Sequence, residues 1–207
     1  ILNDNYGLNL TYGTLAALVK YPWFSDSPDD KRFHDKKFGI FKSEKEVIES
    51  VWDKTGLAEG QRHPFTYVME ACDDIAYCVL DAEDTVKKGY ASFYDLMAYL
   101  KEQGGSNKII DDVIKYSEEK NHDFSKQELT SSELNEISMQ MFRVKAIYHL
   151  ITEATKCFVE HIDHILKGEI DTTFELVEKC NASLLCKLLK DFDKRYGFKN
   201  AKKIPPL

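Results

Sequence analysis

The chain has 207 residues, of which 43% are hydrophobic and 30% are charged, a composition typical of one globular domain or of two small ones. Its net charge of −7 argues against general nucleic-acid binding, although a local basic cluster can still hold a nucleotide. The sequence has no apolar run long enough to span a bilayer and no signal peptide, so we expect no membrane partner. Because the first residue is Ile1, we expect the natural N-terminus to lie upstream of it.

Helical periodicity runs through nearly the whole sequence and predicts an all-α fold. Capping boxes at Ser43-x-x-Glu46 and Thr130-x-x-Glu133 begin two of the helices, and the glycines at positions 56, 89 and 168 are placed to end helices. Polar loops are predicted over 23–41, which is also locally basic, and over 121–126. In chain order, helices are predicted over 8–19, 43–56, 64–88, 92–103, 107–120 and 133–167, with one or two more between 172 and 196.

The five cysteines include no Cys-x-x-Cys pair and are odd in number. This usage favours buried thiols in a reducing compartment over a zinc site, so we expect a cytoplasmic protein. The cysteines are Cys72, Cys78, Cys157, Cys180 and Cys186.

Within the predicted helix 64–88, Asp73, Tyr77 and Asp81 are spaced four residues apart and therefore share one face. One interpretation is a solvated polar face of an amphipathic helix, to which Glu70 and Asp84 also belong. The other is a functional face. Four further apolar residues widen the hydrophobic arc, so the helix should be mostly buried, and an aspartate at the edge of a buried surface needs a cation or a donor. These four are Met69, Cys72, Ala76 and Leu80.

Three motifs occur in order within the first part of the chain and resemble the bacterial dGTPase-type triphosphohydrolases of the HD superfamily. A weaker match follows at Phe142-Arg143-Val144-Lys145-Ala146. The three are Leu10-Thr11-Tyr12 … Lys20-Tyr21-Pro22-Trp23, then Lys36-Lys37-Phe38-Gly39 … Lys42-Ser43-Glu44, and then Arg62-His63-Pro64 … Glu70-Ala71-Cys72-Asp73-Asp74-Ile75-Ala76-Tyr77.

The resemblance implies an all-helical HD-domain bundle that hydrolyses a dNTP, with dGTP as the expected substrate, to deoxynucleoside and triphosphate. It implies a divalent metal ion such as Mg²⁺ or Mn²⁺, held by ligands in the order His … His-Asp … Asp. The final aspartate corresponds to Asp73. Tyr77 corresponds to the tyrosine that packs on the sugar, and Asp81 to the acceptor of the 3′-hydroxyl.

The resemblance also assigns residues to the phosphates. Lys20, Tyr21 and Lys37 correspond to side chains that approach the triphosphate, and Arg143 to a second nucleotide contact. His63 is either a substrate contact or a residue that begins the helix. A homo-oligomer is implied as well.

The His … His-Asp part of the metal site is missing from this sequence. His34-Asp35 and His122-Asp123 lie in polar loops, and neither is expected to be the metal pair. The remaining ligands and any catalytic acid or base are expected before Ile1, so we expect this chain alone to be inactive. Residues 1–90 are then expected to be the end of the catalytic core, and 91–207 a helical region that packs on it.

Two other classes of function stay open. One is another HD-type phosphohydrolase that acts on a nucleotide or phosphoester. The other is a non-enzymatic helical module that binds proteins through the acidic helix face and the basic loop. The Lys-Tyr-Pro and Lys-Phe-Gly motifs favour the triphosphohydrolase over both.

Overall fold

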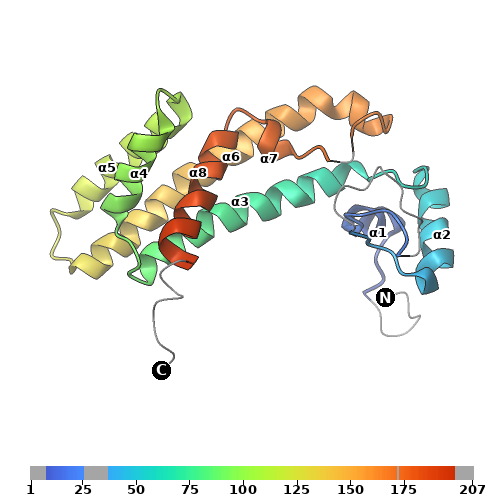
Figure 1. The fold of residues 1–207 in the computed structure, drawn as a ribbon, viewed down its shortest axis with the longest axis horizontal. Helices are drawn as coiled ribbons and strands as arrows, with labels where there is room; N and C mark the ends of the chain where they lie inside the picture. The colour runs from blue at the N-terminus through green and yellow to red at the C-terminus, as the bar shows by residue number, and fades with distance from the viewer. Residues whose placement is uncertain (1–7, 26–36, 172, 199–207) are drawn as a thin grey trace. The chain divides into compact units, whose positions relative to one another are not determined.

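The computed structural model describes residues 8–25, 37–171 and 173–198, and helices make up most of these ranges (Figure 1). Over the same ranges, strand pairing is limited to one isolated bridge between Phe24 and Ile40. The predicted all-α fold is confirmed. Among the described helices, none combines the length and the apolar character needed to cross a bilayer.

The chain divides into two compact units. The first unit combines residues 1–71 with 158–176, and the second combines 72–157 with 177–207. Helices α3 (Pro64–Lys87) and α6 (Ser131–Leu166) each contribute residues to both units. The division into 1–90 and 91–207 concerns the whole protein and stays a prediction.

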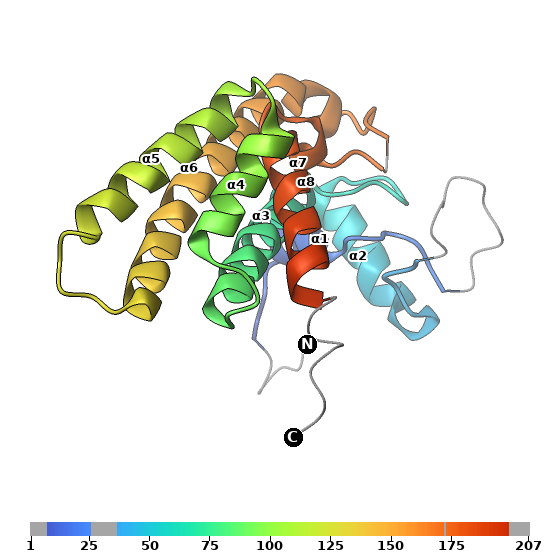
Figure 2. The ribbon, with the colours of Figure 1, turned by 60° about the vertical axis from the view of Figure 1, so that its left-hand side comes forward.

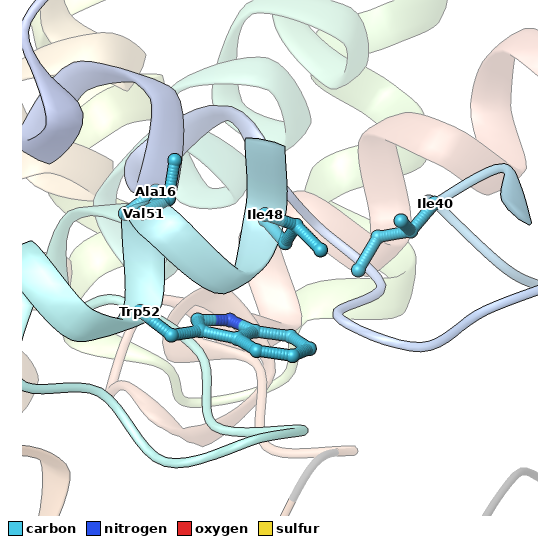
Figure 3. Close-up of a cluster of buried hydrophobic side chains, with 5 residues drawn as sticks. All are labelled: Ala16, Ile40, Ile48, Val51 and Trp52. Carbon is cyan, nitrogen blue, oxygen red and sulfur yellow. The ribbon is translucent and has the colours of Figure 1, made fainter. Parts of the chain in front are cut away.

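In the first unit, α1 (Tyr12–Leu18) packs against α2 (Lys45–Thr55). Their core is a small hydrophobic cluster, in which Ile40 of the preceding loop points toward the side chains of α2 (Figure 3). The ring of Phe24 packs edge-on against Trp52, with 6.0 Å between ring centroids. The buried members are Ala16, Ile40, Ile48, Val51 and Trp52.

Two predicted helix starts in this unit are wrong. Helix α1 begins after Thr11, whose side chain accepts a hydrogen bond from the backbone N–H of Thr14, and not at residue 8. Ser43 does not cap α2, because a short 3-10 turn, η1 (Lys42–Glu44), precedes that helix. There Glu44 accepts from the backbone N–H of Phe41 at 2.9 Å. The predicted end of α2 is confirmed, since Gly56 adopts φ 73°.

In the second unit, α4 (Phe93–Gly104) and α5 (Lys108–Phe124) form an antiparallel hairpin, and α8 (Ser183–Phe192) packs on α4 (Figure 2). The short helix α7 (Leu176–Lys179) precedes α8, and the π-helical turn η2 (Asp193–Phe198) follows it. Thr130 and Glu133 form the predicted capping box at the start of α6. The largest fully buried side chains of this unit include Phe93, Leu96, Phe142, Leu189 and Phe192.

Helix α5 is longer than predicted, and it includes His122-Asp123, which we expected in a loop. Its last turns are held by Asn121, whose buried side chain donates to the Ser138 hydroxyl and accepts from the Tyr94 hydroxyl, each at 2.9 Å. The other His-Asp pair, His34-Asp35, lies outside the described residues.

Candidate functional site

The predicted face of α3 lies at the surface of the second unit. Asp73 is exposed, and Tyr77 is 63% exposed. The prediction that α3 is mostly buried is wrong for this part of the helix, because Cys72 is also exposed and Leu80 is 44% exposed. The buried stripe is narrower and lies on the other side of the helix, at Ile75, Cys78, Val79, Ala82 and Val86.

Asp73 and Asp74 have different surroundings. The Asp74 carboxylate pairs with Lys190, with 2.6 Å between Oδ1 and Nζ. Among the described residues, no side chain pairs with the Asp73 carboxylate. No three His, Cys, Asp or Glu side chains in the described ranges are placed to hold a metal ion together. Asp73 is an exposed carboxylate and is therefore able to serve as one ligand of a metal ion, with the other ligands coming from elsewhere.

Asp81 lies about two helical turns beyond Asp73, nearer the end of α3. It lines a pocket of about 240 Å³ together with Thr85 and Lys88. Partial burial raises the pKa of Asp81, and the negative charges of Asp193 and Asp84 raise it further. These surroundings destabilise the charged form of the Asp81 carboxyl group. A hydrogen-bond donor placed next to it would therefore stabilise it.

Three cationic side chains surround the ring of Tyr21 in the first unit. The Nζ atoms of Lys20 and Lys37 both lie 5.6 Å from the ring centroid, and the Cζ atom of Arg62 lies 5.8 Å from it. At such distances each cation is attracted by the negative face of an aromatic ring. The predicted phosphate-binding residues Lys20, Tyr21 and Lys37 are thus brought together, and Arg62 joins them.

The chain brings Lys37 to Tyr21 through a short backbone pairing. Ile40 donates to the Trp23 carbonyl at 3.2 Å, and the Trp23 indole donates to the Lys37 carbonyl. A Cβ atom on Gly39 would lie 2.6 Å from the Tyr21 carbonyl oxygen, which is too close for any side chain. The glycine of the Lys-Phe-Gly motif is therefore needed for the approach to the Lys-Tyr-Pro motif.

Glu70 anchors two of the cations. Its side chain is 5% exposed, and its two oxygens lie 3.1 Å from Lys20 Nζ and 3.0 Å from Arg62 Nη1. Partial burial opposes the charge of Lys20, but the hydrogen bond and the charge of Glu70 outweigh it and raise the pKa of Lys20. The Arg62 side chain is 4% exposed, and its buried Nε has no hydrogen-bond partner among the described residues.

Sequence reasoning missed this role of Arg62 and Glu70. Glu70 was placed on the possibly solvated face of α3, yet it is buried, whereas Asp73 and Asp84 of that face are exposed. The available signal was an arginine and a glutamate eight positions apart at the beginning of one helix. It did not indicate that Lys20 would complete the group.

Two candidate nucleotide contacts are occupied by other interactions. His63 lies at the start of α3, where its Nδ1 accepts from the backbone N–H of Phe65 at 3.2 Å, and burial lowers its pKa. The guanidinium of Arg143 donates to both oxygens of the buried Glu83, at 3.0 and 2.8 Å. Their roles as substrate contacts stay predictions.

Comparison with known proteins identifies relatives of the chain, although no family model matches it. A deoxyguanosinetriphosphate triphosphohydrolase-like protein of Listeria monocytogenes is 30% identical over 199 residues, which is 96% of this chain and 41% of the relative. A probable deoxyguanosinetriphosphate triphosphohydrolase of Pseudomonas aeruginosa is 31% identical over 175 residues, which is 79% of this chain and 35% of the relative. The deoxyguanosinetriphosphate triphosphohydrolase of Yersinia enterocolitica is 29% identical over 191 residues, which is 90% of this chain and 37% of the relative.

These relatives confirm the resemblance that the motifs predicted. Similarity extends over most of this chain, including the part after residue 89, where the motifs gave little indication. The chain spans about two fifths of the length of these curated relatives. It is therefore a homologue of part of the deoxyguanosinetriphosphate triphosphohydrolases.

Proposed function

We propose that this chain supplies substrate-binding groups to an HD-domain enzyme that hydrolyses a deoxynucleoside triphosphate, with dGTP as the expected substrate, to deoxynucleoside and triphosphate. The observation that carries the proposal is the convergence of Lys20, Lys37 and Arg62 on the ring of Tyr21. A cluster of cations in a protein with a net charge of −7 is a local site for an anion such as a triphosphate. The names of the relatives supply the substrate class.

The proposed roles follow from the chemistry of each group. Lys20 and Lys37 neutralise the charge that develops on the leaving triphosphate. Tyr77 packs on the deoxyribose, and Asp81 accepts a hydrogen bond from the 3′-hydroxyl. Asp73 would provide one ligand to a divalent ion, and such an ion, when bound, would supply Lewis-acid chemistry to the phosphoryl group and to a bound water. The other ligands and the acid or base come from the rest of the enzyme, which we expect to be a cytoplasmic homo-oligomer.

Replacement of Lys37 by alanine tests the phosphate site. In the full-length protein, K37A is expected to weaken binding of a non-hydrolysable dNTP by about 10- to 100-fold, the worth of one charge-assisted hydrogen bond. Binding of the deoxynucleoside should not change, because it has no phosphate. Lys45→Ala is the matched control, since Lys45 is exposed on α2 and pairs only loosely with Glu49, at 3.7 Å. Equal dNTP affinity of K37A and K45A would show that Lys37 does not bind phosphate.

Replacement of Asp81 by alanine tests the sugar contact. The loss of an acceptor for the 3′-hydroxyl is expected to cost about 1.5–3 kcal/mol, seen as a fall in kcat/KM. The difference should vanish with a 2′,3′-dideoxynucleotide, which has no 3′-hydroxyl to donate. Asp123→Ala is the control, because Asp123 is exposed, pairs with Lys126 at 3.4 Å and does not line the pocket of Asp81. If D81A and D123A both keep wild-type kinetics, Asp81 belongs to a solvated face, as the interaction-module alternative requires.

A further inference from the structure

Glu70 lies between two cations of the first unit and gives one carboxylate oxygen to each. Its Oε1 atom lies 3.1 Å from the Nζ atom of Lys20, and its Oε2 atom lies 3.0 Å from the Nη1 atom of Arg62. The Glu70 side chain is 5% exposed, whereas the Lys20 side chain is 39% exposed. Because an ammonium group has three N–H donors, Lys20 can keep its bond to Glu70 and still donate to an anion on its solvent side.

Arg62 is too deeply buried to contact such an anion itself. Its side chain is 4% exposed, and one of its nitrogens is bonded to Glu70. Its Cζ atom lies 5.8 Å from the ring centroid of Tyr21 and 5.7 Å from that of Tyr67, which is also buried. Arg62 therefore acts on a bound anion through Glu70 and not by direct contact.

The charge of Arg62 determines whether Lys20 keeps its attraction for an anion. With Lys20 as its sole partner, Glu70 would form a neutral ion pair. With Arg62 at the other oxygen, the group of two cations and one anion stays positively charged, and the ammonium of Lys37 beside the ring of Tyr21 adds to this charge. Glu70 can therefore hold Lys20 in place while the group still attracts an anion.

The packing of α1 against α3 holds Glu70 opposite Lys20. Thr66 and Glu70 are four residues apart on α3 and therefore share one face of the helix. The Thr66 hydroxyl donates to the Ala17 carbonyl at 3.0 Å, which ties this face to the end of α1, just before Lys20 in the chain. The contact between Glu70 and Lys20 is therefore supported by a second bond between the same two segments.

We propose that Glu70 is a positioning residue of the triphosphate site, which holds the Lys20 ammonium in place before the phosphates bind, while Arg62 balances the charge of Glu70. The inference rests on the proposed function, because it names the residue that orients one of the proposed phosphate contacts. A lysine that is already held in place loses less rotamer freedom when an anion binds, so the anion binds more tightly. The alternative is that Glu70 is only the counter-ion of the buried Arg62.

Glu70→Asp separates the position of the carboxylate from its charge. Aspartate keeps the negative charge that Arg62 needs, but it is shorter by one methylene, so the carboxylate is drawn away from Lys20. In the full-length protein, E70D is expected to weaken binding of inorganic tripolyphosphate by about 3- to 10-fold, the cost of ordering one long side chain. The effect should be absent when Lys20 has already been replaced by alanine, because no side chain is then left to position.

Glu49→Asp is the matched control, because Glu49 is 53% exposed and lies on α2 of the same unit. Equal tripolyphosphate affinity of E70D and E49D overturns the positioning role, and so does an equal loss in E70D with and without Lys20. If the wild-type protein does not bind tripolyphosphate, or if K37A binds it as tightly as the wild type, the phosphate site itself is wrong and this inference falls with it. The two failures are thus distinguishable.

Glu70→Gln gives a second readout. If Glu70 were only a negative charge near the site, its removal would strengthen tripolyphosphate binding, whereas the positioning role predicts weaker binding. Burial lowers the pKa of Lys20, but the hydrogen bond and the charge of Glu70 raise it more. The Lys20 amine should therefore be acetylated faster in E70Q than in the wild type at a fixed alkaline pH. Tighter binding or an unchanged acetylation rate contradicts the proposal, and E70D decides it if E70Q fails to fold.

Discussion

If Asp73 is the proposed metal ligand, Asp73→Asn is expected to remove metal binding and turnover from the full-length protein while leaving the fold intact. The substitution keeps the side-chain volume but replaces a charged ligand with a neutral one. Because residues that merely orient metal ligands already cost about 10- to 100-fold when changed, loss of a ligand should lower metal affinity by at least about 100-fold. Titration calorimetry with Mn²⁺ measures the affinity, and far-ultraviolet circular dichroism checks the helices.

Asp74→Asn is the matched control for this prediction. Adjacent residues differ by about 100° around a helix, so the two aspartates cannot face one ion in the same way. Asp74 pairs with Lys190, whose side chain is half exposed, so D74N should cost at most about 1 kcal/mol of stability and should keep the metal. Loss of the metal in D74N with retention in D73N would show that the register assigned to α3 is wrong, and the roles of Tyr77 and Asp81 would fall with it.

Glu70→Gln is expected to lower the free energy of unfolding by about 3–5 kcal/mol, the usual cost of removing one partner from a buried ion pair. The reason is that Arg62 is almost completely buried and would keep its charge without a counter-ion. Urea denaturation of the full-length protein, followed by circular dichroism, measures the difference.

Glu49→Gln provides the comparison in the same unit. Glu49 and Lys45 are both more than half exposed, at 53% and 62%, so this change should cost only about 0.5 kcal/mol or less. Similar losses in E70Q and E49Q would mean that water screens the Arg62–Glu70 pair and that it does not hold the cation cluster in place.

Much of the fold could be predicted because helices depend on local signals. Each of these signals involves residues that are neighbours along the chain. They are the 3.6-residue period, the capping box at Thr130 and Glu133, and the glycines at positions 56, 89 and 168. The structure confirms the helices that they delimit. The errors occurred where a distant contact overrode a local signal. Helix α5 continues past its predicted end because Asn121 bonds to Tyr94 and Ser138, which no local pattern reveals.

The candidate site divides in the same way. Asp73, Tyr77 and Asp81 could be placed on one face from their spacing alone, since helical geometry fixes which residues share a side. The sequence by itself also determined the resemblance to the triphosphohydrolases at Lys20, Tyr21 and Lys37. Each of these residues belongs to a motif of consecutive residues, which can be read without the structure.

Only the tertiary structure decided which charged groups are buried and which are exposed. Arg62, Glu70 and Lys20 form one ion-paired group because the end of α1 packs beside the start of α3 in the first unit, where the Thr66 hydroxyl donates to the Ala17 carbonyl at 3.0 Å. Burial and ion pairing depend on neighbours that are remote in sequence. The charge or polarity of a side chain does not by itself indicate which of these neighbours it contacts.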